Sequence, residues 1–438
     1  MSAKYLYDGG ITSKLWLDRR KFYLTPQEYA ELWPNVTPFS TLLQNTRKKS
    51  GLPDPLFKLF EHENPWIKQE MVCSSAKTVP NNNSGVAANE VSATTGLVAY
   101  DALDDSLLGL EMECWDSTRT TKRGTAVITA VVADTSFTVK NLTTTAFTTE
   151  SGDIWVVMGN VRGEGSTAGD AWADELSVVY NSTQFFSKSV EVTGKLYKAS
   201  LRGANDELAR LRKQKGEAFK MQQEHAYFKG TSVIGTGMDG TALADTYRTD
   251  ADGNPLRTTM GIIPIIETYG SSTATDDDQN IFNINPAVYD YPSFVDDMEK
   301  VFQYESGSGQ KFAFCGPGAM SYWSKLDSSQ FFAGKSGWSV QLSGTSQNKL
   351  GFNVRKLETP HGILHLVPTK ALKYAYNNYM VVVDESNLFH AEFEPNMFKH
   401  NIKTEDDYNG VKDVYTGDSG IGVTLQKAHQ LFKILKTT

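Results

Sequence analysis

The chain has 438 residues, and its 43 basic and 51 acidic residues give a net charge of -8. That balance argues against a dedicated nucleic-acid-binding domain, which is normally basic, while 11% aromatic residues argue for ordered structure. Its three cysteines, Cys73, Cys114 and Cys315, are too widely spaced for a disulfide framework or a paired-cysteine zinc site. Because no apolar run matches a membrane helix or a signal peptide, we expect a soluble intracellular product of two or three domains.

The first 70 residues have the pattern of an arm rather than a domain, with two short helix starts. Thr25-Pro26-Gln27-Glu28 is a capping box with proline at the first helical position, and Thr37-Pro38 repeats the threonine-proline start. A segment that has apolar docking residues but no core of its own usually packs on something else. We therefore expect four apolar residues of this arm to contact a neighbouring subunit: Phe39, Leu42, Leu43 and Trp66.

Residues 71–100 contain few bulky apolar residues, and this composition predicts an exposed extended loop. The character of the chain then changes, because Leu110, Met112 and Cys114 alternate with glutamates and further Thr/Val-rich strands follow up to residue 160. Short strands joined by tight turns predict a small β-barrel or sandwich of about 55 residues.

A β-branched and aromatic stretch, residues 176–200, predicts a long strand that leads into a helix over residues 203–230. At 3.6 residues per turn, one stripe of this helix is apolar and holds Ala204, Leu208, Leu211, Phe219 and Ala226. The opposite side is charged and holds Arg210, Lys213, Glu217, Lys220 and Glu224, with pairs four residues apart. Gly203 or Asn205 can cap the start, and Gly230 is a natural stop. Such a helix is roughly 40 Å long.

From Tyr291 onward the pattern alternates between helices and strands. Residues 293–305 and 318–326 predict helices, and the intervening apolar run predicts a short buried strand. Further strands are predicted over 363–369, 379–384 and 388–394. The end of the chain, residues 411–436, predicts a strand pair.

No catalytic or metal-binding constellation is apparent. The glycines of residues 235–240 fit GxGxxG but lack the strand before and the helix after, so a flexible loop is favoured. His361 and His365 share one face of a predicted strand near Glu358, where ordinary half-buried histidines are favoured over a metal site. Asp276 to Asp278 suit a solvated turn, and Cys315 suits a small buried residue better than a nucleophile. We expect no cofactor and no enzymatic activity.

Six stretches along the chain carry a resemblance to a known family. They are VTPFSTLL in the arm, EGSTAGDAW and YNSTQFFSKSVEVTG before the long helix, NDELARLRKQKGEAFKMQQEHAYFKG in the helix, and YMVVVDESNLFHAEFE and GIGVTLQKAHQLFKI later. In this order they resemble the major capsid proteins of tailed phages with the Hong-Kong-97-type fold. More narrowly, the chain is similar to the branch with a small β-domain inserted in its extended loop.

The resemblance implies an α+β fold with named parts. These are an N-terminal arm (1–66), an extended loop (67–195) with an inserted β-domain (104–162), a peripheral domain (196–289 and 399–438) with its spine helix (203–230), and an axial α/β domain (290–398).

The resemblance also implies self-assembly as hexamers and pentamers into an icosahedral shell around double-stranded DNA. Expected partners are a portal protein, a separate scaffold protein and a decoration or cement protein, with no membrane. The resemblance implies that the protein is located in the virion, after assembly in the host cytoplasm. Four basic residues of the helix are candidates to face the genome, the alternative being a solvated helix face: Arg210, Arg212, Lys213 and Lys220.

Two other classes of protein stay open from the sequence. One is another self-assembling phage structural protein, such as a tail-tube, sheath or adhesin subunit, although tail-tube proteins do not need a spine helix. The other is a hydrolase that uses the α/β part after Tyr291. The only candidate site residues for it are His361 and His365.

Overall fold

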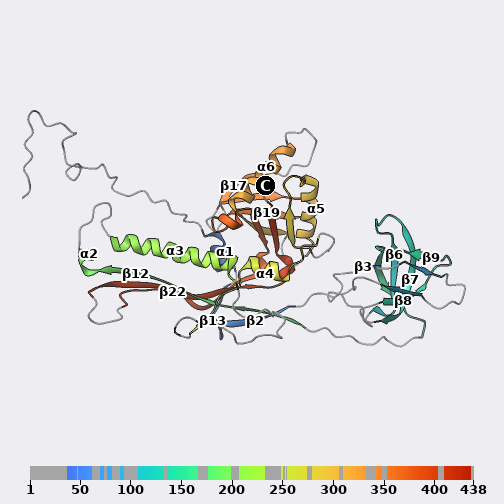
Figure 1. Cartoon of the computed structure of the whole chain (residues 1–438), viewed down its shortest axis with the longest axis horizontal. Coiled ribbons are helices and arrows are strands. Elements are labelled where there is room, and N and C mark those ends of the chain that lie inside the picture. Colours follow the sequence, from blue (N-terminus) through green and yellow to red (C-terminus); the bar gives the residue numbers. More distant parts are fainter. Residues whose placement is uncertain are drawn as a thin grey trace, which may run out of the picture. The chain divides into compact units, whose positions relative to one another are not determined.

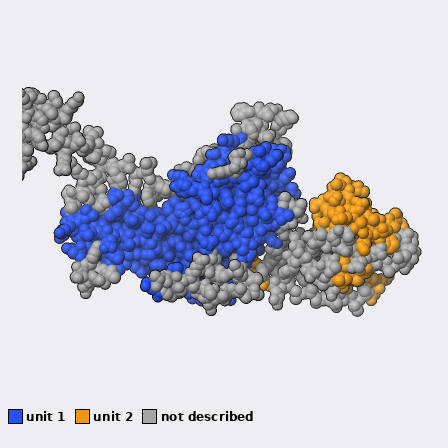
Figure 2. Space-filling view, viewed as in Figure 1, with its two compact units in different colours: residues 1–59, 178–438 blue, residues 60–177 orange. Residues whose placement is uncertain are grey.

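The computed structural model of the chain describes residues 37–46, 48–61, 70–73, 76–80, 89–92, 107–132, 136–165, 176–198, 207–231, 248–249, 252, 254–273, 279–304, 309–331, 342–347, 353–402 and 409–435. The chain divides into two compact units, residues 60–177 and the remainder (Figure 2). Helices and strands are mixed, so the expected α+β class is confirmed. Among the described residues, no helix is both long enough and apolar enough to cross a membrane.

A four-stranded sheet in the larger unit lies beside the long helix. Its strands follow the order β1 (Lys48–Ser50), β21 (Leu388–Lys399), β22 (Gly410–Val423) and β12 (Gln184–Thr193). The helix α3 (Glu207–Lys229) runs along β12 and β22 (Figure 1). Side chains alternate along β12, so Val190 and Val192 face the helix and pack against Leu208. The period-two strand and the 3.6-period helix thereby share one apolar seam.

A seven-stranded mixed sheet forms the second layer of the larger unit. Its strands follow the order β15 (Ile281–Ile284), β23 (Gln430–Ile434), β20 (Tyr379–Val383), β16 (Gln310–Cys315), β19 (Ile363–Pro368), β18 (Asn353–Glu358) and β17 (Leu342–Gln347). Neighbouring strands are antiparallel except for two parallel pairs, β15 with β23 and β16 with β19. The central strand β16 is buried from its second residue to its last, as expected of a strand that is covered on both faces.

Helices cover both faces of this sheet. On one face, α5 (Tyr291–Val301) and α6 (Pro317–Phe331) pack over Ala313 and Cys315 of β16. On the other face, α1 (Pro38–Thr46), α4 (Ile262–Tyr269) and the end of α3 pack over Phe312 and Phe314. Alternate residues of one strand therefore belong to two different cores.

The sheet includes two strands from outside residues 290–398, namely β15 and β23. The strand pair predicted over residues 411–436 is wrong, because β22 and β23 lie in different sheets. Between them Leu425 has a left-handed backbone, with φ of 50°, and a single 3-10 turn over Gln426–Ala428 redirects the chain. A change of sheet at this turn replaces the expected hairpin.

The smaller unit, residues 60–177, is built from strands. A six-stranded antiparallel sheet has the order β3 (Glu70–Val72), β10 (Ile154–Asn160), β6 (Leu110–Trp115), β7 (Lys122–Val132), β8 (Ser136–Asn141) and β5 (Asn89–Ser92). Beside it, β4 (Lys77–Val79) pairs with β9 (Phe147–Thr149). Trp155 packs at the centre of the core with Phe137 edge-on at 5.7 Å. The predicted alternation of Leu110, Met112 and Cys114 is confirmed, since all three are buried.

The prediction of an exposed loop over residues 71–100 is wrong for the described part of that range. Strands β3, β4 and β5 lie there, and Met71, Cys73 and Val79 are buried in the core of the smaller unit. Apolar residues 71–73 form a run of only three, and mostly polar residues separate it from Val79, so the sequence lacks the longer apolar run that marks a strand. Their pairing with β8, β9 and β10 stabilises them as strands.

Five smaller elements complete the larger unit, apart from 3-10 turns at Tyr374–Tyr376 and Glu385–Asn387. They are β2 (Leu56–Glu61), which pairs with β11 (Ser177–Ser182), β13 (Arg248–Thr249), which pairs with β14 (Pro255–Leu256), and the short helix α2 (Gly194–Lys198). The predicted long strand over 176–200 is therefore two strands and a short helix. The strand changes partners at Thr183, whose N–H donates to Pro55 O at 2.8 Å.

The other predicted elements agree with the structure. Thr37-Pro38 begins α1, and the helices and strands predicted between residues 293 and 394 appear as α5, β16, α6, β19, β20 and β21. The long helix ends at Lys229, and a Cβ atom at Gly230 would lie 2.3 Å from Thr259 O, so only glycine fits this stop. The predicted caps Gly203 and Asn205, and the helix start at Thr25, lie outside the described residues.

Candidate functional site

The long helix α3 is joined to its neighbours by a row of side chains along its length. Its predicted apolar stripe is confirmed at Leu208 and Phe219, which are buried, whereas Leu211 and Ala226 are half-buried. Ala204 lies outside the described residues. The first half of α3 is amphipathic as predicted, but the last two turns are buried on several sides. We take this row of contacts as the candidate site, because it links three parts of the larger unit.

Arg212 ties the first half of α3 to β22. Its guanidinium meets one carboxylate oxygen of Asp413, Oδ2, with Nε at 2.8 Å and Nη2 at 2.7 Å, a charge-assisted contact. Asp413 is 0% exposed, and its other oxygen accepts the N–H of Asn401 at 2.8 Å. Tyr415, two residues along β22, donates its hydroxyl to Arg212 O at 3.1 Å. These contacts fix the helix against the strand by charge and by backbone.

A second group of contacts joins the C-terminal half of α3 to the four-stranded sheet. The amides of Gln223 and Asn396 bond reciprocally at 2.8 and 3.3 Å. One turn later, the hydroxyl of Tyr227 lies 2.8 Å from Ser419 Oγ and 3.1 Å from His390 Nε2. Burial raises the pKa of this tyrosine above its usual value of 10.0, so the hydroxyl stays protonated. The sheet therefore holds the helix through buried neutral groups.

Glu224 joins α3 to the N-terminal helix α1. Its Oε1 accepts the N–H of Phe39 at 3.0 Å and its Oε2 accepts the N–H of Ser40 at 2.7 Å. These are first-turn amides, which have no partner within their own helix. The predicted position of Glu224 on the solvated face is therefore wrong, since its side chain is 0% exposed. A carboxylate at the positive end of a helix replaces the expected surface pair with Lys220.

The end of α3 contacts the segment after β19. Lys229 donates its ammonium to Ala371 O at 2.5 Å, and the same Nζ lies 4.9 Å from the centre of the Tyr376 ring. Burial lowers the pKa of Lys229 below its usual value. The helix thus touches α1, the four-stranded sheet and the seven-stranded layer within one span.

Three of the four residues expected at subunit contacts lie inside their own chain. Phe39, Leu42 and Leu43 are at most 1% exposed and belong to the core on one face of the seven-stranded sheet. Phe39 stacks on Phe228 with ring centroids 4.4 Å apart. In the single chain these side chains dock α1 on its own subunit, and their contact with a neighbouring subunit stays a prediction. Trp66 lies outside the described residues.

The four basic residues of α3 differ in their exposure and in their contacts within the chain. The guanidinium of Arg212 forms the ion pair with Asp413. Lys213 and Lys220 are exposed, and Arg210 is half-buried. Whether they face a genome stays a prediction.

The weak chemical candidates of the sequence do not form a site. His361 lies in the turn before β19 and not on the strand with His365, whose Nε2 lies 3.1 Å from Gln310 Oε1. Within the described residues, no cluster of three or more histidine, cysteine, aspartate or glutamate side chains could hold a metal ion. Cys315 is buried, as predicted, and all three cysteines are free thiols. Residues 235–240 and 276–278 lie outside the described part.

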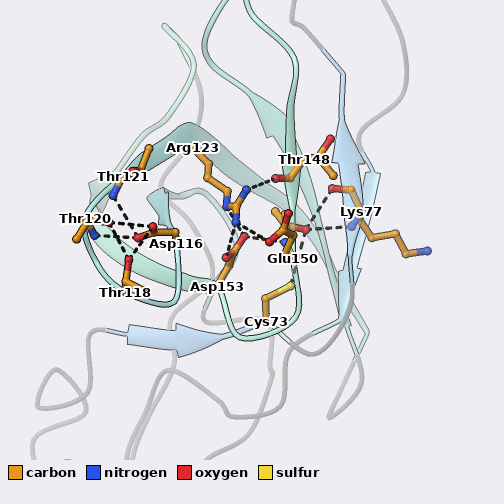
Figure 3. Close-up of polar contacts among 11 residues, drawn as sticks. Cys73, Lys77, Asp116, Thr118, Thr120, Thr121, Arg123, Thr148, Glu150 and Asp153 are labelled. Atoms are coloured by element: carbon orange, nitrogen blue, oxygen red, sulfur yellow. Dashed lines mark hydrogen bonds and ion pairs between the residues drawn. The ribbon is translucent and has the colours of Figure 1, made fainter.

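The smaller unit has an ion-pair cluster of its own (Figure 3). Arg123 of β7 contacts Asp153 with Nε 2.6 Å from Oδ2, and its Nη2 donates to Glu150 Oε2 at 3.0 Å. Asp153 also accepts the N–H of Glu150 at 2.7 Å. In the same view, Asp116 accepts the N–H groups of Thr120 and Thr121 and closes the turn between β6 and β7. Every partner in these contacts belongs to the smaller unit, so the cluster acts within its fold.

The sequence pattern does not predict the contacts of several of these residues. Gln223 and Tyr227 fell between the predicted stripes, and their partners Asn396, His390 and Ser419 lie more than 160 residues away. The signal that was available is the clustering of large and polar residues in QQEHAYF, which fits no single helix face.

Comparison with known proteins gives one strong match. The sequence model of the SU10 major capsid protein family matches residues 28–436. A search of curated proteins finds no match. Among solved structures, the chain is similar to the capsid of a native GTA particle, with 9% identity, a TM-score of 0.42 and coverage of 96% of this chain and 97% of that chain.

Two phage structures show similarity of the same order. The capsid of cyanophage Pam1 has 12% identity and a TM-score of 0.38, over 63% of this chain and 82% of that chain. A chain of Mycobacterium phage Ogopogo has 12% identity and a TM-score of 0.37, over 64% of this chain and 83% of that chain. Because these TM-scores are low, the weight rests on the family match.

Proposed function

Because the chain belongs to the SU10 major capsid protein family, we propose that it is the major head protein of a tailed double-stranded DNA phage. Hexamers and pentamers of the chain would close an icosahedral shell around the genome. The observation that carries this proposal is the length of the family match, residues 28–436, which includes both compact units. A structural, non-enzymatic role is part of this proposal, and membership of a capsid family supports it.

We further propose the Hong-Kong-97-type arrangement for this shell subunit. Its support is the long helix α3 against a four-stranded sheet, together with a second, helix-covered sheet. In this proposal the arm is 1–66, the peripheral domain is 196–289 with 399–438, and the axial domain is 290–398. We place β15 and β23 with the axial domain, because they hydrogen-bond within its sheet.

The strand-built unit of residues 60–177 would correspond to the extended loop (67–195) with its inserted β-domain (104–162). Supporting this, strands β6 to β10 lie inside the expected 104–162 range and share one core. Strands β3 and β4 add Met71 and Val79 to that core from residues before 104, and β5 pairs with β8.

The proposed partners are those of a phage head: a portal protein, a separate scaffold protein, a decoration or cement protein, and packaged DNA. The protein would be part of the virion after assembly in the host cytoplasm. For the DNA contact we retain Arg210, Lys213 and Lys220, and give Arg212 less weight because Asp413 holds it. Replacement of Lys220 by glutamine should reduce the slope of log binding constant against log salt by about 1 if it meets a phosphate. An unchanged slope would assign Lys220 to a solvated helix face.

Electron microscopy of the expressed full-length chain tests the proposed function. Closed isometric particles would support a head protein. Tubes or small trimers would favour the alternative that the chain is a tail-tube, sheath or adhesin subunit. A hydrolytic activity that is lost when both His361 and His365 are replaced would favour the alternative that the chain is an enzyme.

A further inference from the structure

The carboxylate of Glu224 is buried at the joint between α1 and α3. It is 0% exposed, and each of its oxygens accepts one backbone N–H from the first turn of α1, at 3.0 and 2.7 Å. The two donors, Phe39 and Ser40, are 185 and 184 residues away in the sequence. One side chain therefore holds the start of α1, and with it the attachment point of residues 1–36.

Among the side chains that the structure describes, none places a positive charge against this carboxylate. The side chains of Lys48 and Lys49 on β1, the strand beside α1, lie outside that description. Helix α1, PFSTLLQNT, contains no ionisable side chain. On α3, Lys220 and His225 are exposed and the adjacent Tyr227 is neutral. Strand β21 carries His390, whose Nε2 lies 3.1 Å from the Tyr227 hydroxyl, and Glu392, 4.0 Å from His390 Nδ1. Helix α4 carries the exposed Glu267 and the half-buried Tyr269. The charge of Glu224 is met by two amides and the dipole of a short helix.

We propose that Glu224 is a proton-operated latch for the N-terminal segment: its protonation favours the docking of α1 on α3, and its ionisation favours release. A neutral carboxyl group keeps a carbonyl oxygen that accepts an amide N–H, and it avoids the cost of a buried charge. The inference rests on the joint between α1 and α3 and does not depend on the proposed capsid function.

The direction of the effect follows from the surroundings of Glu224. Burial raises its pKa from 4.5 to about 7, and the amide bonds from Ser40 and Phe39 offset only part of this rise. When α1 is released, water reaches the carboxyl and its pKa returns toward 4.5. A group with a raised pKa in the docked state stabilises docking fully below pH 4.5, and this stabilisation is lost as the pH rises through 7. Between pH 5 and pH 8 the docking equilibrium should weaken by roughly 70-fold.

Hydrogen exchange of the full-length chain measures this opening directly. The protection factor of a peptide covering α1, corrected for intrinsic exchange, is followed from pH 5 to pH 8 and compared with a peptide covering β20. Two variants are compared with the natural chain: Glu224→Gln, and Glu299→Gln as a matched change at an exposed glutamate of α5.

We expect the α1 protection factor to fall by roughly 70-fold in the natural chain and in Glu299→Gln, while β20 stays within a few-fold. In Glu224→Gln the α1 protection factor should be lower at pH 5 but independent of pH. Equal pH dependence in the natural chain and Glu224→Gln would overturn the latch. So would a parallel fall at β20, because α1 would then open only with the whole unit.

Discussion

Replacement of Phe39 by alanine tests whether α1 belongs to the core of its own chain. The Phe39 ring is 0% exposed, stacks on Phe228 at 4.4 Å and meets Phe314 edge-on at 5.0 Å. Truncation of a buried phenylalanine costs about 3–5 kcal/mol, which includes the transfer of the ring and the cavity left behind. Because two aromatic contacts are lost together, we expect a loss of about 4 kcal/mol in the free energy of unfolding.

The assay is urea unfolding of the unassembled chain at several protein concentrations. Phe185→Ala is the matched control, since Phe185 is 58% exposed and should cost less than about 1 kcal/mol. Equal losses in the two variants would refute the burial of Phe39. A loss that grows with protein concentration would show instead that Phe39 packs in a neighbouring subunit, as the sequence alone suggested.

Two further predictions concern α3. Asp413→Asn should lower the free energy of unfolding by about 2 kcal/mol, because it removes the charge from a buried contact with Arg212. Glu191→Gln, at an exposed glutamate, should change it by less than about 0.5 kcal/mol. Similar losses in the same urea assay would contradict the role given to Asp413. Phe219→Asp should abolish most soluble protein, since it buries a charge, and Lys220→Glu should leave the yield near normal. Equal yields on expression would argue against the orientation of the helix.

Local patterns predicted those elements whose signals are complete within a few residues. Thr37-Pro38 is a local signal for the start of α1, and Gly230 is a local signal for the end of α3. The alternation of apolar and polar residues in β6 is likewise visible within the strand. The runs that become β16 and β20 are short, apolar and bounded, so the sequence predicts strands there, the first of them buried. In each case neither the residue type nor the spacing depends on a distant partner.

Contacts between distant segments explain what the sequence did not predict. Glu224 lies four residues after Lys220, a spacing typical of a surface ion pair, yet the approach of α1 buries it. The sequence does not distinguish Arg212 from the other basic residues of the helix. Its ion pair with Asp413, 201 residues later in the chain, sets it apart in the structure. The strands β3 to β5 depend in the same way on pairing with strands that follow later in the chain.

A high-resolution reconstruction of the assembled particle tests the central claim most directly, because it reports the symmetry of the shell and the path of α1 together. We expect hexamers and pentamers in a closed icosahedral shell, with α1 of each subunit held by Glu224 of the same chain. Helical or tubular symmetry would contradict the proposed function. An α1 that packs on the α3 helix of a neighbouring subunit would contradict the joint described here.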